Sequence, residues 1–589
     1  MPGNPLELGS IVGGGKPLVL PASARDRHLY VCGGTGVGKS KFLEHCIRQD
    51  ILNWRDSRCG LILLDPHGLV YQNIMAWLAR HGLKRPVIPI DLRRDDWIIS
   101  YNLLRRQVTS SSVVVSNFVT ALAHVWGEGG TDRTPLFARW ASVILLTLYE
   151  NGYTIGDAME LLTRSDIRQG MSARMTDATA RQAWQFALRN PKEFENQISS
   201  SLNRFARLTG PAIMEATYGQ LGASLDLLTA LKEGQIILVN LSTEGGQIHK
   251  EHARTFGTLL LTDLWAAAQV PGKKEREHIQ PFYVYIDECQ NFITPTIAED
   301  LDQARGYGLQ LTLANQFPKQ LINAGPHGQA MYDSILANAG NKIVFRLEHP
   351  DDAESLAKWL FMGTFDTDAI KLKLNSTKVV GYREEIRETR TTGNSTTDAT
   401  NSGRGGGSFQ GQSAGTGEAG TQNFRGDDLS ADPLGSAEGW NRYVANSSGE
   451  SENWQEGQSH AETVNQSVAR GTVLIPIMGE EVSSVQFKSI EEQQFRAMQK
   501  LFDQEDRHFI TRFQGGPKAP LFVKTPTVTP APAKKERVEK YRENLLKRLP
   551  FALPMPEAAK RVVERKEKLI AEIVQTPFDE PTTARRKVQ

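Results

Sequence analysis

A glycine-rich loop near the N-terminus has the residue types needed to hold the phosphates of a nucleotide. The loop satisfies the pattern GxxxxGK followed by Ser or Thr, and it consists of Gly33, Gly34, Thr35, Gly36, Val37, Gly38, Lys39 and Ser40. Glycines let the backbone curl so that successive N–H groups point at phosphates, and a following helix adds its positive end. We therefore expect Lys39 to reach the β- and γ-phosphates of ATP and the Ser40 hydroxyl to bind Mg²⁺.

The surroundings of this loop decide whether the pattern is a chance match, because glycine-rich loops are common. The apolar run HLYV comes directly before the loop, and the helical run KFLEHCIRQDI follows it. A strand before and a helix after are the context that a phosphate-binding loop requires. The sequence therefore predicts a nucleotide site here.

Two adjacent carboxylates follow a second apolar run. Phe282–Ile286 leads directly into Asp287 and Glu288. In a nucleotide hydrolase, Asp287 would hold Mg²⁺, directly or through water, and Glu288 would polarise the attacking water. The alternative is a strand that ends in two solvated acids. The phosphate-binding loop favours the catalytic interpretation.

Three further polar residues are candidates for the same reaction. Gln316 follows the run LQLTL, and we expect it to sense the γ-phosphate or to position the water, if its strand lies between the other two; the alternative is a helix N-cap. Arg305, in LDQARGYGL, is a candidate arginine finger that acts on the ATP of a neighbouring subunit; the alternative is a surface salt bridge. Arg346 is a second candidate for this role.

The turn Asp65-Pro66-His67-Gly68 ends another apolar run. His67 could touch the nucleotide or its water network. The alternative, which the sequence favours, is a turn that caps a strand at the carboxyl edge of the sheet, where ligands collect in such folds.

The overall composition limits the class of protein. The chain has 589 residues, and its 40% apolar and 23% charged residues are ordinary for a folded protein in water. Its 68 Lys and Arg residues nearly balance 67 Asp and Glu residues, which leaves a net charge of +1. A protein that coats itself with nucleic acid through bulk charge is therefore excluded, and any such contact has to be local.

Cysteine usage and hydropathy bear on the compartment. Cys32, Cys46, Cys59 and Cys289 form no CxxC pair and no zinc motif, so we expect a reducing compartment, the cytoplasm. The first ten residues have no features of a signal peptide. The longest apolar stretch, Trp140–Tyr149, is about half of the roughly 20 residues that span a bilayer, so a buried helix is expected.

The elements that must position these residues alternate between strand and helix patterns. From Arg25 to Thr109, apolar strands at 29–32, 61–64 and 87–90 alternate with helices at 39–52 and 70–80. This alternation predicts an α/β fold with a mostly parallel sheet covered by helices. Further buried strands are expected at 235–241, 282–286, 309–313 and 342–347.

Changes in composition predict the domain boundaries. Residues 110–233 repeat apolar residues at helical spacing and are expected to form an all-α insertion, whereas 388–470 are rich in Gly, Ser and Thr and are expected to be a flexible, disordered loop. The expected order is 1–109, the first part of the ATPase domain; 110–233, the insertion; 234–387, the second part; 388–470, the loop; 471–527, a return to the core; and 528–589, a Pro-rich, charged helical tail.

Several motifs in order resemble a known family. RHLYVCGGTGVGKSKF, LILLDPHGLV, YVYIDECQNF, LDQARGYGLQLTLANQ and NKIVFRLEHPDDAE follow one another along the chain. Together they resemble the HerA/FtsK class of P-loop ATPases and, within it, the TraG/TraD-like coupling proteins of type IV secretion and conjugation. The resemblance covers about residues 5–390 and 471–527.

The resemblance implies a RecA-like core in a homo-hexameric ring that hydrolyses ATP with Mg²⁺ and pulls DNA through a central pore. It implies the roles already assigned to Lys39, Ser40, Asp287 and Glu288, with Gln316 as sensor and Arg305 as finger in trans. A relaxase, or another DNA-processing or secretion component, is the expected partner. Membrane-bound members begin with transmembrane helices and this sequence shows none, so membrane attachment is expected only through a partner.

Two matters remain open at the level of sequence. The DNA contacts are poorly marked: His249, Lys250 and Arg254 in the run STEGGQIHKEHAR are candidates for lining the pore, and a solvated helix start is the alternative. The function also has an alternative, a nucleotide-gated adaptor that assembles on ATP and recruits a protein partner in a defence or secretion complex.

Overall fold

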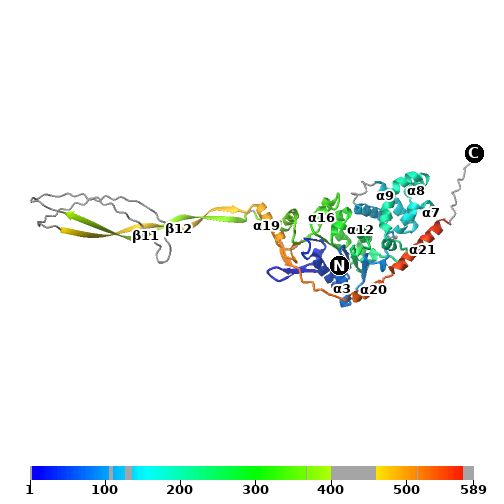
Figure 1. The fold of residues 1–589 in the computed structure, drawn as a ribbon, viewed down its shortest axis with the longest axis horizontal. Coiled ribbons are helices and arrows are strands. Elements are labelled where there is room, and N and C mark those ends of the chain that lie inside the picture. The colour runs from blue at the N-terminus through cyan, green and yellow to red at the C-terminus, as the bar shows by residue number, and fades with distance from the viewer. Residues whose placement is uncertain are drawn as a thin grey trace, which may run out of the picture. The chain divides into compact units, whose positions relative to one another are not determined.

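The computed structural model describes residues 3–104, 111–126, 135–366, 368–399, 459–513 and 515–574. The chain forms two compact units, one from Met1–Ala369 with Phe487–Gln589 and the other from Ile370–Gln486. The first unit holds the core sheet and nearly all helices, and the second is a two-stranded ribbon (Figure 1).

The central part of an 11-stranded sheet is parallel. Its strand order is β10–β3–β9–β8–β4–β7–β5. The bounds are β3 Leu29–Cys32, β4 Leu61–Asp65, β5 Val87–Asp91, β7 Ile236–Asn240, β8 Phe282–Ile286, β9 Leu309–Asn315 and β10 Asn341–Phe345. Every residue of these strands except Asp91 is buried, as parallel strands covered on both faces must be. The predicted fold class is confirmed.

Antiparallel strands extend this sheet beyond β10. They are β13 His508–Arg512, β14 Leu521–Lys524, β1 Leu6–Ile11 and β2 Pro17–Leu20, paired in that order. The N-terminal strands and those that follow the ribbon therefore meet in one sheet.

Helices cover both faces of the sheet. The helices nearest the core are α1 Ala22–Arg25, α2 Lys39–Ser57, α3 Leu69–His81, α12 Lys250–Gln269, α13 Lys273–Arg276, α14 Pro295–Glu299, α15 Leu301–Ala304, α16 Pro318–Ile322, α17 Gly328–Asn338, α18 Pro350–Phe361 and α19 Ile490–Phe502.

The insertion between β6 (Trp97–Ile99) and β7 is helical: the described residues from Ser111 to Glu233 contain helices and connections but no strand. The helices are α4 Ser111–Val125, α5 Pro135–Asn151, α6 Ala158–Thr163, α7 Ser165–Ala173, α8 Ala178–Arg189, α9 Pro191–Thr209, α10 Ala212–Tyr218 and α11 Leu227–Glu233. Trp140, Trp184 and Phe194 pack ring against ring at their centre. The apolar stretch 140–149 lies in α5, and no helix in the described part of the chain is both long and apolar enough to cross a membrane.

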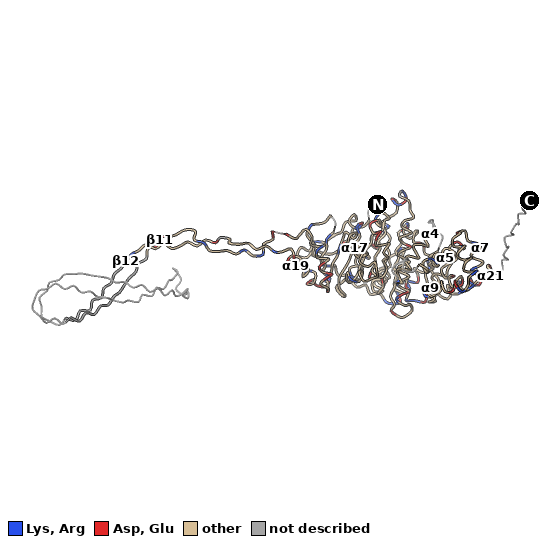
Figure 2. Tube along the Cα trace, turned by 90° about the horizontal axis from the view of Figure 1, so that it is seen from above, with Lys and Arg blue, Asp and Glu red and all other residues tan. Residues whose placement is uncertain are grey.

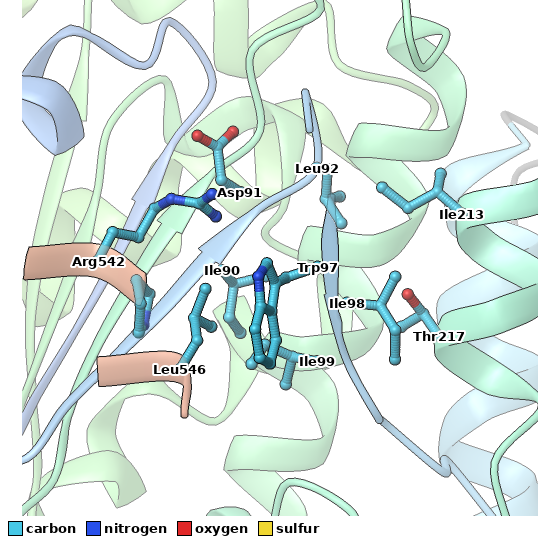
Figure 3. A pocket seen from close by; sticks show the side chains of 11 residues that line it. Ile90, Asp91, Leu92, Trp97, Ile98, Ile99, Ile213, Thr217, Arg542 and Leu546 are labelled. Atoms are coloured by element: carbon cyan, nitrogen blue, oxygen red, sulfur yellow. The ribbon is translucent and has the colours of Figure 1, made fainter. Parts of the chain in front are cut away.

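The C-terminal segment packs on both the core and the insertion. It consists of α20 Lys535–Leu546, β15 Ala552–Pro554 and α21 Met555–Val574. Helix α20 packs on α3, β15 pairs with β6, and α21 lies along α7 and α10 (Figure 1). Figure 3 shows side chains from β5, β6, α10 and α20 around one small pocket, among them Ile90, Ile98, Ile213 and Leu546.

Polar contacts reinforce this packing. Arg565 of α21 forms an ion pair with the buried carboxylate of Asp157. The Nζ of Lys566 lies 2.9 Å from the Oε1 of Glu160 and 2.7 Å from the Oε1 of Glu215. The charged residues of the predicted tail are therefore bound, in part, to the insertion.

The second unit differs from its predicted boundaries. Strands β11 Ile370–Ala399 and β12 Ser459–Phe487 pair with each other, so 388–399 and 459–470, expected to belong to a flexible loop, are strands. The ribbon also includes 370–387 and 471–487, which were expected in the ATPase core. Low apolar content argues against a packed core but not against backbone pairing of Thr- and Val-containing strands. The middle of the predicted loop, 400–458, lies outside the described residues.

Charge is dispersed along the chain. Lys and Arg are interspersed with Asp and Glu over the described residues (Figure 2), in keeping with the net charge of +1. Bulk attraction of a polyanion has no basis in this distribution.

The packing of α21 predicts a stability effect. Leu569 is 1% exposed, so Leu569→Ala should lower the free energy of unfolding by about 2–5 kcal/mol, because a cavity replaces buried methyl groups. Urea unfolding followed by circular dichroism measures this change. The exposed neighbour supplies the control, since Lys568→Ala should stay within about 0.5 kcal/mol of wild type. Equal stabilities of the two variants would contradict the packing of α21.

Candidate nucleotide site

The loop Gly33–Ser40 joins β3 to α2 at the carboxyl edge of the sheet. Gly36 and Gly38 have φ angles of 78° and 113°, in the left-handed region that favours glycine. A Cβ on Gly33 would lie 2.5 Å from the Cβ of Phe345 in the neighbouring strand β10. The glycines thus allow both the curl of the loop and its close approach to the sheet, which is the backbone cradle that phosphate binding needs.

Lys39 lies inside this cradle. Its Nζ donates to the carbonyl oxygens of Gly33 at 2.5 Å and Gly34 at 2.7 Å. Burial lowers the pKa of Lys39, although the nearby Glu288 and Asp287 oppose the shift. A phosphate entering the loop would replace the two carbonyls as partner of the ammonium group.

The remaining candidates converge on the same edge. Strand β9 lies between β3 and β8, as the role suggested for Gln316 requires. The carboxyl ends of β4, β8 and β9 carry Asp65, Asp287 with Glu288, and Gln316 respectively. Because all these strands are parallel, their last polar residues gather beside the phosphate-binding loop.

Asp287 is the most strongly perturbed acid of the site. It is 2% exposed, and burial, together with the charges of Asp65 and Glu288, raises its pKa to about 7. His67 and Lys39 act in the opposite direction. A divalent cation would favour the ionised form, which makes Asp287 a suitable Mg²⁺ ligand.

For Glu288, the effects that lower the pKa outweigh the effect of burial, which raises it. Burial raises its pKa, but hydrogen bonds involving His67, Gln290 and Gln316 outweigh burial, so the net shift is downward. The Nε2 of Gln316 donates to Oε1 at 3.0 Å, and the Nε2 of Gln290 donates to Oε2 at 2.8 Å. These contacts keep the carboxylate ionised, as a group that accepts a proton from water must be.

Gln316 connects this carboxylate to the phosphate-binding loop. Its Oε1 accepts a hydrogen bond from the Oγ1 of Thr35 at 3.4 Å, while its backbone carbonyl accepts from the N–H of Gly33 at 3.2 Å. The N-cap of α16 is Phe317, so the alternative interpretation of Gln316 as a helix cap is not what the structure shows.

The turn after β4 supports the site from the other side. Asp65 accepts hydrogen bonds from the backbone N–H groups of His67, Gly68 and Tyr71, at 3.0, 2.8 and 2.9 Å. The turn therefore ends β4 at the carboxyl edge of the sheet, as expected, and the Asp65 side chain also binds backbone N–H groups at the start of α3. His67 is also placed beside Glu288, with 3.7 Å between its Nε2 and the Oε1 of Glu288, and this contact is the main cause of its raised pKa.

The two arginine candidates lie at opposite edges of the sheet. Arg305 begins a 3-10 turn, Arg305–Tyr307, just before β9, at the edge opposite the loop of its own chain. It is 54% exposed, its Nε lies 4.0 Å from the Oδ2 of Asp26, and it borders an open hollow of about 550 Å³. Arg346 follows β10 at the loop's own edge: its carbonyl accepts from the N–H of Gly34 at 2.8 Å, and its guanidinium lies 2.9 Å from Asp506.

The candidates for DNA contact divide into two kinds. His249 precedes α12 and, like Lys250, is exposed. Arg254 is partly buried, and its Nε donates to the carbonyl of Asn291 at 3.0 Å. Arg254 is therefore engaged by its own chain, and His249 and Lys250 are the exposed candidates.

Two contacts of the loop had no signal in the sequence. The N–H of Arg507, which precedes β13, donates to the carbonyl of Val37 at 2.8 Å. Glu348 lies against Gly34, where a Cβ would come within 2.7 Å of its Oε1. Arg507 belongs to no motif, and Glu348 lies within the run NKIVFRLEHPDDAE, which had not marked it as a neighbour of the loop. Only the folded chain shows that both contact the loop.

Comparison with known proteins supports the predicted family. Residues 281–401 match the family model described as the TraM recognition site of TraD and TraG, which confirms the resemblance to TraG/TraD-like coupling P-loop ATPases over that part of the chain. None of the curated proteins matches the sequence.

Solved structures of the coupling protein TrwB and of VirB4 share a remote similarity with this chain. The bacterial conjugative coupling protein TrwBdeltaN70, in its unbound monoclinic form, has a TM-score of 0.46 and 13% identity over 91% of this chain and 95% of that chain. TrwB in complex with ADP and Mg²⁺ has a TM-score of 0.40 and 16% identity over 60% and 81%. VirB4 of Thermoanaerobacter pseudethanolicus has a TM-score of 0.41 and 14% identity over 60% and 87%. The fold assignment depends on the strand order of this chain itself.

The raised pKa of Asp287 predicts a dependence of stability on pH. Between the ordinary value of 3.8 and about 7, the folded protein binds this proton more tightly than the unfolded chain, so the contribution of Asp287 to stability falls as pH rises and is lowest above pH 7. In the Asp287→Asn variant the side chain at this position does not ionise, so this decrease in stability with rising pH is absent. Without nucleotide and Mg²⁺, the variant should lose less stability than wild type over this interval.

Urea unfolding at a series of pH values measures the effect. Asp302→Asn, which removes an exposed acid, is the matched control and should follow the wild-type curve. A wild-type curve parallel to that of Asp287→Asn would contradict the burial of an easily protonated Asp287.

Proposed function

We propose that the chain is an ATP-hydrolysing motor that moves DNA through the central pore of a homo-hexameric ring. The observation that supports the ATPase activity is the convergence of Lys39, Asp287, Glu288 and Gln316 at one sheet edge. The family match and the resemblance of the ordered motifs support the ring and its DNA substrate.

Each of these residues has a part in the proposed reaction. Glu288 accepts a proton from a water as that water's oxygen forms a bond to the γ-phosphorus, and the bond from this phosphorus to the β–γ bridging oxygen breaks, releasing ADP and phosphate. Lys39 offsets the charge on the phosphate oxygens. Mg²⁺, held by Ser40 and Asp287, would add charge stabilisation there. Gln316, held between Thr35 and Glu288, reports whether a γ-phosphate is in the loop.

A protein partner is the second part of the proposal. The family description names a site at which TraD and TraG recognise TraM, and by analogy we infer that residues 281–401 contribute to docking a relaxase or another DNA-processing or secretion component. The same observation favours the alternative function, an adaptor whose ATP site controls partner recruitment without transport.

Glu288→Gln tests the catalytic assignment. ATP turnover should fall by about 10²- to 10⁴-fold because the proton acceptor is lost, while nucleotide binding is retained. Lys39→Ala should weaken nucleotide binding itself. Turnover is measured with and without DNA at low salt, and binding with a fluorescent ATP analogue.

The control is Glu299→Gln, an exposed acid outside the site, which should leave turnover unchanged. Wild-type turnover that is indifferent to every form of DNA would contradict the motor. If the Glu288→Gln variant still recruits a partner but no longer transports DNA, recruitment and transport are separate activities. If the protein is an adaptor, the wild type itself recruits a partner and transports no DNA.

Arg305 predicts complementation between subunits. Arg305→Ala should lower turnover by about 10³-fold or more if the residue stabilises the transition state on a neighbour's ATP. Mixed rings of Arg305→Ala and Lys39→Ala subunits should regain activity, because an intact loop then meets an intact Arg305 from the adjacent subunit.

Arg346→Ala is the matched comparison. Arg346 lies at the edge of its own phosphate-binding loop, so mixing Arg346→Ala with Lys39→Ala should restore nothing. Rescue of Arg346→Ala and none of Arg305→Ala would exchange the roles of the two arginines.

A further inference from the structure

The ribbon of β11 and β12 is too long and too thin to be stable alone. Its strands contain 30 and 29 residues, about 100 Å of extended chain. A two-stranded ribbon is at best marginally stable in water, and further strands or a packed face are needed. Something must therefore cover it in the working protein.

Large apolar side chains are exposed along the ribbon. In β11, Ile370, Leu372 and Leu374 alternate with Lys371 and Lys373 and are 43–47% exposed, and farther along Val380, Tyr382 and Ile386 are 63–71% exposed. In β12, Val473, Ile477, Val485 and Phe487 are 36–55% exposed. Residues two apart in a strand share a face, so β11 has its large exposed apolar side chains mainly on its even-numbered side. Strand β12 exposes apolar side chains on both sides, because Leu474, Met478 and Val482 are also 50–57% exposed.

The pairing places the even-numbered side of β11 beside the odd-numbered side of β12. The side chain of Asn375 donates to the Oε2 of Glu480 at 3.4 Å, so odd-numbered residues of β11 share a face with even-numbered residues of β12. A Cβ on Gly479 would lie 2.5 Å from the Cγ1 of Val380, so the even residues of β11 share a face with the odd residues of β12. The even-numbered apolar residues of β11 and the odd-numbered apolar residues of β12 therefore share one exposed face, and Leu474, Met478 and Val482 lie on the opposite face.

Both edges of the ribbon are also open in the described part of the chain, since β11 and β12 pair only with each other. Each edge presents a row of unpaired backbone groups, which is a template for another strand. Covering an edge along its length needs a strand of about 30 residues. Strands in globular proteins are usually 3–10 residues long, whereas another copy of this chain has strands of matching length.

We propose that ribbons from neighbouring copies of this chain join edge to edge, β11 of one copy against β12 of the next, into a continuous sheet. A ring gives every subunit two neighbours through two different surfaces, and the ribbon has two different edges. When neighbouring ribbons run in the same direction, β11 of one copy lies antiparallel to β12 of the next copy. The backbone groups of these two strands then pair in the same way as β11 and β12 pair within one ribbon. The adjoining apolar faces then pack side by side. The inference rests on the ring assembly of the proposed function.

Cross-linking between single-cysteine subunits tests this arrangement. The four native cysteines are buried. Lys373→Cys on β11 and Ser484→Cys on β12 are introduced into separately tagged full-length chains, which are mixed with ATP and Mg²⁺ and treated with a bismaleimide. Links between the two tags are expected to outnumber links within either tag. Asn196→Cys, exposed in the insertion, is the control and should cross-link with neither.

A charge substitution supplies the second measurement. Val380→Lys, Tyr382→Lys and Ile386→Lys together should raise the concentration needed for ring assembly at least tenfold, measured by sedimentation velocity, because like charges then meet across each junction. The control places three lysines at exposed apolar positions elsewhere, Leu52, Leu136 and Val563, which are 49–56% exposed, and should assemble like wild type.

The outcomes separate this inference from the proposed function. Rings that hydrolyse ATP but give no links between β11 and β12, or chiefly links between two β11 strands, would overturn the ribbon assembly alone. Ribbon links in a protein whose ATP turnover ignores DNA would support the ribbon assembly and overturn the motor.

Discussion

The parallel pairing of β3 with β9 and of β9 with β8 is the constraint on which the candidate site depends. Side chains from sequence positions more than 270 residues apart, Lys39 and Gln316, become neighbours only because these strands end at one edge. The buried residues on both faces fix the register of the strands, because a slip would place apolar side chains against the wrong layer. The geometry of the site is thus a consequence of the packing of the core.

Charge balance is the second requirement at this edge. Asp65, Asp287 and Glu288 are buried within one region that also contains Lys39. Hydrogen bonds hold Asp65 and Glu288, whereas Asp287 has the high pKa of a carboxylate with too little compensation. A cation bound at this edge would offset the charge of these carboxylates, so metal binding would add to the stability of the edge itself.

The residues that sequence could identify are those with a motif or a strand end. The phosphate-binding loop has a strict spacing, and the β8 acids follow an apolar run that could only be a strand. The order of β3, β9 and β8 followed from the role suggested for Gln316, and the structure confirms it. Arg507 lies in no motif, and the motif that contains Glu348 does not indicate that this residue contacts the loop, so both were missed.

The errors in the ribbon have a physical origin as well. Amino-acid composition measures how much apolar surface a segment can bury in its own core, and by that measure 388–470 is poor. It does not measure backbone pairing, which holds β11 to β12 through N–H and C=O groups that every residue has except proline, which lacks the N–H. The apolar alternation of 370–374 was an available signal for a strand, but the segment was only included in the predicted second part of the ATPase domain, 234–387, because its partner strand lies about a hundred positions away.

The C-terminal segment has a mechanical consequence for the molecule. Helix α20 packs on α3, β15 pairs with β6, and α21 packs on α7 and α10. The C-terminal segment therefore contacts both the core and the helical insertion at several points. The Arg565–Asp157 ion pair adds a polar contact between α21 and the insertion. A movement of the insertion relative to the core sheet would therefore have to break contacts of the C-terminal segment with one part or the other.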